Sequence, residues 1–482
     1  MPPTISFGTD GWRAVIADQF TFDNVRLVAD GMAVAMRTFR PPPDIDTNAI
    51  AIGFDRRFLS REFAAVVAEC FRAAGFRVIL SDRPTPSQSI SFTAKHRGIL
   101  GGIVVTASHN PARYNGLKLK AWYGGSALPE MVETVTSSLG QRSSRPGGSV
   151  TEENLLEDYV EALRGQLDVT LIRGAKLAIL HDPIYGVSAS LPSKVVGIDF
   201  IGSLRIQKGS TEPLTETVID GIRGEVNPSF GGVNPEPIPE NLNASQNVML
   251  TRAYDLAICN DGDADRLGIL DEQGRFVSPH KIISLLALYL VREKKRAGEI
   301  VKTFSTTRLL EKVAASLGAT LHETPIGFKY VADLMLTNDV LIGGEESGGI
   351  GFGAFMPERD GILSGLMVAE AVAHYGRPLS EIIAAMEQEF IELHYDRRDL
   401  HRPMEQCARL IERVRAGELD RAFGVPFAGR EEKDGVKMNF TDDSWILFRK
   451  SGTEPIIRIY CESPSSEQVQ RMLDVAVAEL DS

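Results

Sequence analysis

The chain has 482 residues, which at roughly 100–200 residues per domain is enough for about three to four domains. Hydrophobic residues make up 43% and charged residues 24%, values that are ordinary for a globular protein. The formal net charge of −12 argues against a nucleic-acid-binding protein, which usually carries a basic face.

The cysteines and the hydropathy pattern exclude further classes. The four cysteines include no CxxC pair, which argues against zinc ribbons and redox motifs, and so few in a long chain fit a reducing compartment. The first residues lack a basic-then-apolar leader pattern. The longest apolar stretch, Ile282–Val291, is too short to span a bilayer. We therefore expect a cytoplasmic protein with no membrane and no nucleic-acid partner.

A strand–helix–glycine–strand pattern recurs along the chain and predicts βαβ units. In the first unit a strand at Ala49–Phe54 precedes a helix at Ser60–Ala74, Gly75 and a strand at Phe76–Leu80. The same order recurs in a second unit, and a looser version starts later in the first half of the chain: Glu299–Phe304, Thr307–Leu317, Gly318 and Ala319–His322, and Lys176–Leu180.

Three predicted strands run into polar or glycine-rich loops. Gly102–Val105 leads into TASHNP, Leu256–Cys259 into NDGDADR, and Val340–Ile342 into GGEESGG. Ligands of α/β sheets gather at the carboxyl ends of strands. The pattern therefore predicts three α/β domains that share one cleft.

Composition suggests where the domains divide. Gln141–Ser149 is polar and reads as a linker, Gly224–Glu240 reads as a long loop, and Ser278-Pro279 opens a helix. From about Ile391 the signals are mixed, which predicts a smaller α+β domain. The expected fold is three related α/β domains plus a smaller C-terminal α+β domain around a central cleft. The expected domain ranges are 1–150, 151–273, 274–388 and 389–482.

The DGDADR loop is the strongest candidate metal site. Asp261, Asp263 and Asp265 stand at alternate positions after a strand, and such carboxylates suit Mg²⁺. An EF-hand is excluded because Arg266 occupies the position that needs glycine and LGIL after it reads as a strand. The remaining alternative is a solvated acidic turn, but clustered acids are costly without a cation.

The loop TASHNP offers a candidate nucleophile. Ser108 follows a strand, but the sequence lacks the G-x-S-x-G elbow, and adjacent residues such as Ser108 and His109 seldom point at each other. An ordinary Ser-His-Asp triad is therefore disfavoured. A structural turn at Asn110-Pro111 is the alternative.

Two further loops can bind anions and hydroxyls. RKSGTEP supplies Arg449, hydroxyls and a glycine that admits backbone N–H groups to an anion, with Arg458 on the next strand as a second cation. Taken alone, a charged β-turn is the alternative. In GGEESGG, Glu345 and Ser347 can hydrogen-bond polyol hydroxyls. The glycines that continue to Gly353 are spaced GxGxG rather than GxGxxG, which disfavours dinucleotide binding.

Together these motifs resemble those of the α-D-phosphohexomutase superfamily, the phosphoglucomutases and phosphomannomutases. The resemblance covers essentially the whole chain. It rests on five motifs in the family's order: FGTDGWR at 7–13, TASHNP at 106–111, DGDADR at 261–266, GEESGG at 344–349 and RKSGTEP at 449–455.

The resemblance implies a role for each matched residue. Ser108 would carry the phosphoryl group and, with the three aspartates, bind Mg²⁺. Lys118, in YNGLK, would be the general base and acid, with Arg13 and Arg266 near the phosphoserine and His109 as a further catalytic candidate. The residues implied in substrate binding are Gly327, Lys329, Glu345, Ser347, Arg449, Ser451, Gly452, Thr453 and Arg458.

The implied reaction interconverts hexose 1- and 6-phosphates through a bound 1,6-bisphosphate, with glucose 1,6-bisphosphate as activator and intermediate. Gly327-Phe328-Lys329 and GEESGG favour glucose phosphate, whereas DGDADR departs from the DPDADR common in phosphoglucomutases and leaves mannose phosphate, or dual specificity, as the alternative. A metal-dependent sugar phosphatase and a non-catalytic sensor are less favoured. The expected partners are hexose phosphates, and the chain is expected to be a monomer or a homodimer.

Overall fold

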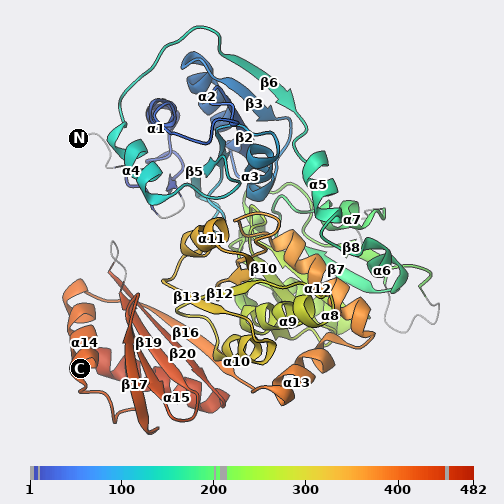
Figure 1. Cartoon of the computed structure of the whole chain (residues 1–482), viewed down its shortest axis with the longest axis vertical. Helices are drawn as coiled ribbons and strands as arrows, with labels where there is room; N and C mark the ends of the chain where they lie inside the picture. Colours follow the sequence, from blue (N-terminus) through green and yellow to red (C-terminus); the bar gives the residue numbers. More distant parts are fainter. Residues whose placement is uncertain are drawn as a thin grey trace.

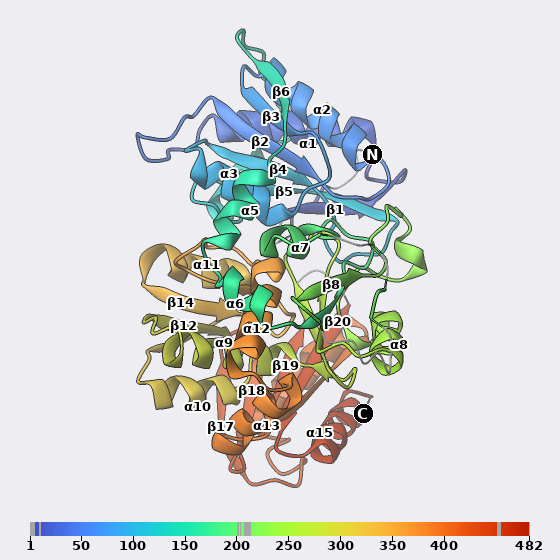
Figure 2. The ribbon, with the colours of Figure 1, turned by 90° about the vertical axis from the view of Figure 1, so that its right-hand side faces the viewer.

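The computed structural model describes residues 5–8, 11–199, 202, 204–206, 214–450 and 455–481. The strands of these residues form four sheets that follow one another along the chain. The first sheet and its helices lie at one end of the molecule and the C-terminal sheet at the other, with the second and third sheets between them (Figures 1 and 2).

The first sheet has the strand order β1-β5-β4-β2-β3-β6, in which β2, β3, β4 and β6 are parallel and β1 and β5 are antiparallel to their neighbours. Its core explains the unbroken apolar run of β2, because Ile50 and Ile52 pack on one face of the sheet and Ala49 and Ala51 on the other. The elements are β1 (Trp12–Val15), α1 (Phe22–Met36), β2 (Ala49–Phe54), α2 (Ser60–Ala73), β3 (Arg77–Ser81), α3 (Ser87–His96), β4 (Gly101–Val105), β5 (Tyr114–Ala121), α4 (Pro129–Ser137) and β6 (Ser149–Glu153).

The second sheet has the order β11-β10-β9-β7-β8 and begins with helices that precede its first strand. Strand β7 starts two residues after the predicted Lys176, and β10 directly follows the DGDADR loop as expected. The elements are α5 (Glu157–Arg164), α6 (Val169–Gly174), β7 (Ala178–Asp182), α7 (Leu191–Val196), β8 (Val218–Gly221), the 3₁₀ turns Phe230–Gly232 and Pro239–Asn241, α8 (Asn243–Thr251), β9 (Leu256–Asn260), β10 (Leu267–Asp271) and β11 (Phe276–Val277).

The third sheet has the order β13-β12-β14-β15 and is flanked by five helices of the described chain. The predicted cap of α9 is confirmed, because the Ser278 side chain accepts a hydrogen bond from the Lys281 N–H. The elements are α9 (Pro279–Arg292), β12 (Glu299–Thr303), α10 (Arg308–Leu317), β13 (Leu321–Thr324), α11 (Phe328–Thr337), β14 (Val340–Gly344), β15 (Ile350–Gly351), α12 (Gly361–Tyr375) and α13 (Leu379–Glu389).

The fourth sheet is antiparallel throughout, with the order β16-β20-β19-β18-β17. Helices α14 and α15 cover one face, where Ile446, Phe448 and Ile459 join their core. The other face carries Trp445 and Tyr460, which pack with Phe304 of the third sheet region, directly after β12. The elements are β16 (His394–His401), α14 (Met404–Ala416), β17 (Phe427–Glu432), β18 (Val436–Phe440), β19 (Trp445–Lys450), β20 (Ile456–Ser463) and α15 (Ser466–Asp481).

The predicted fold class is confirmed: three α/β/α units precede a C-terminal antiparallel domain. The sheets do not end where composition placed the domain ranges. The expected boundary at residue 150 falls inside β6, which pairs with β3, and the boundary at residue 273 precedes β11 of the second sheet. The four domain ranges remain a prediction.

The hydrophobic cores do not follow the four sheets one to one. The first and fourth sheets each have a core of their own. The second and third share one, because α9 and α12 contact strands of both sheets, and Ile258 of β9 and Ile342 of β14 belong to the same cluster. These two sheets therefore form a common central body.

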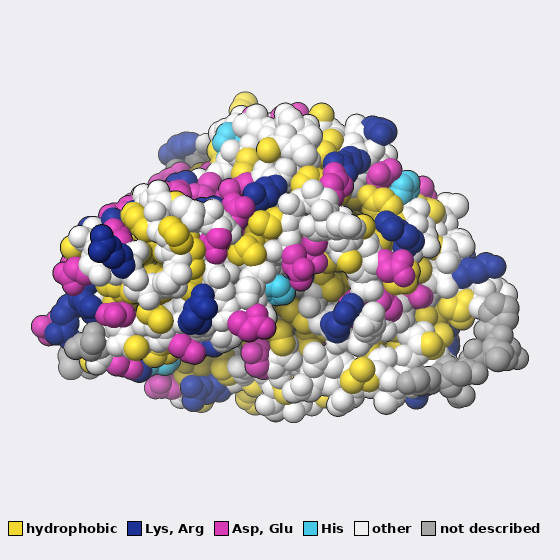
Figure 3. Space-filling view, turned by 90° about the horizontal axis from the view of Figure 1, so that it is seen from below, with side chains coloured by type: hydrophobic (Ala, Val, Ile, Leu, Met, Phe, Trp, Pro, Cys, Tyr) yellow, Lys and Arg dark blue, Asp and Glu magenta, His cyan; other side chains and the backbone are white. Residues whose placement is uncertain are grey.

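One face of the molecule carries charged side chains of both signs (Figure 3). On the face drawn in Figure 3, acidic and basic side chains are interspersed rather than segregated. Within the described ranges no helix combines the length and the apolar character needed to cross a membrane.

Candidate active site

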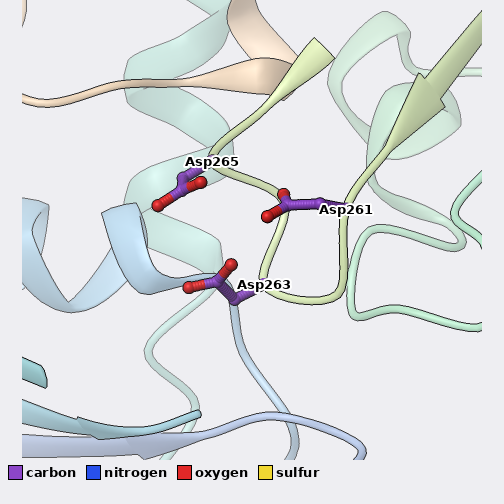
Figure 4. Close-up of side chains that lie close together, drawn as sticks. All are labelled: Asp261, Asp263 and Asp265. Atoms are coloured by element: carbon purple, nitrogen blue, oxygen red, sulfur yellow. The ribbon is translucent and has the colours of Figure 1, made fainter. Parts of the chain in front are cut away.

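The three aspartates of the DGDADR loop converge, as the sequence predicts. The loop joins β9 to β10, and Asp261, Asp263 and Asp265 turn their carboxylates toward a common centre (Figure 4). One oxygen from each lies within 4.8 Å of the others, and all three residues are buried. Ala264 in the left-handed region, at φ 66°, gives the loop the tight bend that this convergence requires.

The electrostatics of this cluster suit a divalent cation. Burial, together with Asp265 and Asp263, raises the pKa of Asp261 well above its usual range. The buried Oδ1 of Asp263 has no hydrogen-bond partner in the described part of the chain. Hard oxygen donors in this number and spacing are what Mg²⁺ binds, so the residues fit the metal that the sequence predicts.

Ser108 lies directly beside the aspartates. It follows β4, and its Oγ donates a hydrogen bond of 2.8 Å to Asp261 Oδ2. Its backbone is held in the left-handed region, at φ 52°, which is costly for a residue other than glycine. The side chain is thus aimed at the carboxylates by a strained loop.

Arg57 holds that loop in place. Its Nη1 donates to the carbonyl oxygens of Pro111 and Tyr114, at 2.9 and 3.0 Å, and its Nη2 to those of Ser108 and Asn110, both at 2.7 Å. The guanidinium is fully buried and pairs with Asp55. No sequence motif predicts this role of Arg57, because the four loop carbonyl oxygens that it binds leave no pattern in the sequence.

Two further cations contact the aspartates. Lys118 of β5 is 1% exposed and donates to Asp263 Oδ2 at 2.8 Å and to Asp265 Oδ2 at 3.0 Å. Burial acts to raise the pKa of Asp263, but Lys118 and the Ser87 hydroxyl hold it below its usual value. Arg359, which no sequence motif predicts, donates to Asp265 Oδ2 at 2.8 Å.

A cleft of about 670 Å³ opens next to this cluster. Residues from all four sheet regions line it. Ser108, Lys118 and the aspartates lie buried beneath its wall and are not among its lining residues. The predicted site residues that do line the cleft are Arg13, His109, Arg266, Gly327, Lys329, Glu345, Ser347, Arg449 and Arg458.

The wall nearest Ser108 is cationic. Arg13 of β1 donates to Asn110 Oδ1 at 2.7 Å, and Arg266 pairs with Glu236 at 2.9 Å. Burial and the two arginines lower the pKa of His109 well below its usual value, so the imidazole is neutral near pH 7. His109 Nδ1 lies 3.4 Å from Ser108 Oγ, so these adjacent side chains do approach each other, contrary to expectation.

The third sheet region contributes the polar loops that the sequence predicts. Gly327, at φ 131°, precedes α11, and Lys329 lies in the first turn of that helix. Glu345 and Ser347 follow β14. Burial raises the pKa of Glu345 to about 7 even though Arg359, 3.5 Å away, opposes the shift.

The fourth sheet contributes cations from the opposite side. Arg449, the last residue but one of β19, pairs with Asp434 at 2.9 Å, and Arg458 of β20 pairs with Asp399 at 3.4 Å. Arg397 of β16 also lines the cleft and was not predicted. Ser451, Gly452 and Thr453 lie outside the described residues.

Comparisons with known proteins agree with this geometry. Domain profiles of the phosphoglucomutase/phosphomannomutase family match residues 4–145, 157–274, 278–390 and 407–479 as alpha/beta/alpha domains I, II and III and the C-terminal domain. The crystal structure of a putative phosphomannomutase from Thermus thermophilus is 33% identical, with a TM-score of 0.84, over all of both chains. The chain belongs to the α-D-phosphohexomutase superfamily.

Other relatives of this phosphohexomutase carry different substrate names. A phosphoglucomutase/phosphomannomutase from Thermococcus kodakarensis is 29% identical over 98% of both chains. A probable phosphoglucosamine mutase from Methanothermobacter thermautotrophicus is also 29% identical, over 96% of this chain and 95% of its own. The family therefore establishes an intramolecular phosphotransferase of the isomerase class but not the sugar.

The buried Glu345 generates a pH-dependent prediction for this phosphohexomutase. The folded chain keeps the proton on Glu345 up to about pH 7, whereas the ordinary glutamate pKa of 4.5 applies to the unfolded chain. Between these values the folded state binds more protons, so this group's contribution to stability falls as pH rises and levels off above pH 7. Since one pKa unit corresponds to about 1.4 kcal/mol, Glu345→Gln should remove a pH-dependent change in the free energy of unfolding that totals a few kcal/mol across this interval.

The measurement is the free energy of unfolding at several values between pH 5 and pH 8, for wild type and Glu345→Gln. The exposed Glu405→Gln on α14 is the control with the same chemical change. A constant difference between wild type and Glu345→Gln across this range would contradict a carboxyl that titrates near pH 7.

Proposed function

We propose that this phosphohexomutase interconverts α-D-glucose 1-phosphate and glucose 6-phosphate through a phosphoserine at Ser108 and a bound 1,6-bisphosphate. One observation carries the proposal: the Ser108 hydroxyl contacts a buried carboxylate triad beside a cleft whose two sides carry arginines. A nucleophile, a metal site and two cationic regions are the parts that transfer of a phosphoryl group between two ends of one sugar needs.

The metal site has named ligands in this proposal. Ser108, Asp261, Asp263 and Asp265 would hold Mg²⁺, and the family resemblance and the orphaned Asp263 Oδ1 support that assignment. When bound, Mg²⁺ would neutralise charge on the phosphoryl oxygens.

The chain's own residues supply the rest of the chemistry. In the first transfer the bond from Ser108 Oγ to phosphorus breaks and a bond from a sugar hydroxyl oxygen to phosphorus forms. Arg13 and Arg266 line the cleft beside Ser108 and are our candidates for neutralising the transferring oxygens. Lys118 is our candidate for accepting the hydroxyl proton, which it can do only as a neutral amine, after the proton it shares with Asp263 and Asp265 in this structure has been given up.

The opposite side of the cleft would hold the phosphate that does not react. Arg449 and Arg458 are the described residues that support this role, and Ser451, Gly452 and Thr453 match the same family loop. Between the two cationic regions, Glu345, Ser347, Gly327 and Lys329 would contact the sugar. The bisphosphate must then turn round, so that its other phosphoryl group returns to Ser108.

The choice of glucose rests on the loops of the third sheet region. Gly327-Phe328-Lys329 and GEESGG resemble the phosphoglucomutase forms and both line the cleft. Mannose phosphate is the alternative that the name of the Thermus thermophilus relative favours, and the name of the Thermococcus kodakarensis relative favours both sugars. A sugar phosphatase would use the same nucleophile and metal but would release inorganic phosphate.

A parallel mutase assay with the 1-phosphates of glucose, mannose, glucosamine and ribose tests the substrate. We expect the highest kcat/KM with glucose 1-phosphate in the presence of glucose 1,6-bisphosphate, with no net release of inorganic phosphate. A higher kcat/KM with mannose 1-phosphate would reverse the ranking of the two hexoses. Stoichiometric phosphate release would instead indicate a phosphatase.

Ser108→Ala should abolish mutase activity because it removes the hydroxyl that contacts the aspartate triad and that would carry the phosphoryl group. We expect a loss of at least about 10³-fold, as for removal of a covalent nucleophile. Intact-protein mass spectrometry after incubation with the bisphosphate should show phosphorylation of wild type but not of the variant. Ser137→Ala, at an exposed position of α4, is the control, and full activity of Ser108→Ala would overturn the mechanism.

Chelation should remove activity, and added Mg²⁺ should restore it. A readout that does not depend on turnover is the midpoint of thermal unfolding, because a ligand that binds only the folded state raises it. We expect Mg²⁺ to raise the midpoint of wild type and to have a much smaller effect on Asp263→Asn. Activity that persists in a strong chelator would exclude a required metal ion.

A further inference from the structure

A row of charged residues crosses the face of the fourth sheet that borders the cleft. Asp399 of β16 stands directly opposite Arg458 of β20, and Arg458 stands directly opposite Arg449 of β19. Arg397 lies two residues before Asp399, and strand alternation places it on the same face. All four residues line the cleft.

The arginines of this row are paired with carboxylates of their own domain. Asp399 contacts Arg397 Nε at 3.0 Å through Oδ1 and Arg458 Nε at 3.4 Å through Oδ2. Asp434, in the turn between β17 and β18, contacts Arg449 Nε at 2.9 Å. Like charges opposite each other on neighbouring strands repel, so these carboxylates offset the repulsion between Arg449 and Arg458.

The carboxylates approach the arginines at Nε. The shortest contact that each of the three arginines makes with its carboxylate is at Nε, whereas bidentate recognition of a phosphate can use the terminal Nη groups. Asp399 lines the cleft beside these arginines, so a phosphate that they bind would lie close to its charge. The effect of the carboxylates on a bound phosphate is Coulombic: each negative charge weakens the attraction between the arginines and a dianion.

We propose that Asp399 and Asp434 are built-in counter-anions that limit how tightly the fourth-domain arginines hold a substrate phosphate. This inference rests on the proposed function, because a bisphosphate that turns round in the cleft must leave the arginines with one phosphate and return with the other. Uncompensated arginines would bind the phosphate more tightly and slow that exchange. The counter-anions thus lower the affinity of the arginines for the bound phosphate and thereby speed the reorientation of the bisphosphate.

Asp399 is the better residue for the test. Asp434 Oδ2 also accepts a hydrogen bond of 3.1 Å from the Ile326 N–H of the third sheet region, so replacing Asp434 would also disturb the contact between the two regions. Within the described residues, the ion pairs of Asp399 stay inside the fourth sheet. In Asp399→Asn the side chain keeps an oxygen acceptor for the arginine Nε groups but loses the charge.

The chain offers a closely matched control. Asp396 lies on the same strand and pairs with Arg398, but alternation turns this pair to the opposite face, where both residues contact Gln470 of α15. Asp396→Asn therefore removes the same charge from the same strand without changing the cleft row. A second test variant, Asp399→Ser, removes the charge with a smaller side chain in case Asp399→Asn folds poorly.

The primary measurement is the affinity for inorganic phosphate by calorimetry, which does not require turnover. We expect Asp399→Asn to bind phosphate about threefold more tightly or better at low ionic strength, with a smaller gain at 0.5 M salt because the Debye length shortens. Asp396→Asn should match wild type. Unchanged or weaker phosphate binding by both folded Asp399 variants would overturn the proposal.

Steady-state kinetics then test the link to reorientation. In the mutase assay Asp399→Asn should lower KM and kcat together, whereas loss of a merely structural ion pair would lower the unfolding midpoint without tightening phosphate binding. An increased kcat would overturn the link. If no hexose phosphate is isomerised by wild type, the proposed function fails, while the phosphate affinities still decide the counter-anion inference.

Discussion

Repulsion among three buried carboxylates is the constraint around which the candidate site is built. Asp261, Asp263 and Asp265 lie within 4.8 Å of one another and out of contact with solvent. Such a cluster is stable only if cations and hydrogen-bond donors surround it. Lys118 and Ser108 supply these from the first sheet region, and Arg359 supplies a guanidinium from the third. The cluster therefore ties three regions of the chain to one point.

The sequence predicted the parts of the fold that burial patterns reveal. The limits of β2 were predicted to the residue, because a strand buried on both faces reads as an unbroken apolar run. Helix α9 was predicted from its cap and its apolar length. The last strands of the first and second sheets were not predicted, because β6 is an exposed, polar edge strand and β11 has only two residues.

The candidate site was only partly predictable for a related reason. Residues within a compact motif, such as the aspartates and Ser108, could be found because the motif itself carries the chemistry. Arg57 binds four backbone carbonyl oxygens, Arg359 reaches Asp265 from 94 positions away, and Arg397 shares a carboxylate with a residue on another strand. Contacts of these kinds depend on the tertiary arrangement and leave no local pattern.

The shared core of the second and third sheets has a consequence for how the molecule is assembled. Helices α9 and α12 belong to the third segment of the chain but pack against strands of the second as well. Separating the two segments would expose apolar surface on both, so they constitute a single cooperative folding unit of two sequence domains. The fourth sheet has a core of its own and meets the third through a much smaller apolar cluster, Phe304 with Trp445, Leu447 and Tyr460, and through ion pairs such as those of Arg308 and Lys312 with Asp443. The arginines that face the cleft from this sheet therefore belong to a body whose attachment to the rest is largely polar, and the strength of that attachment should depend on salt concentration.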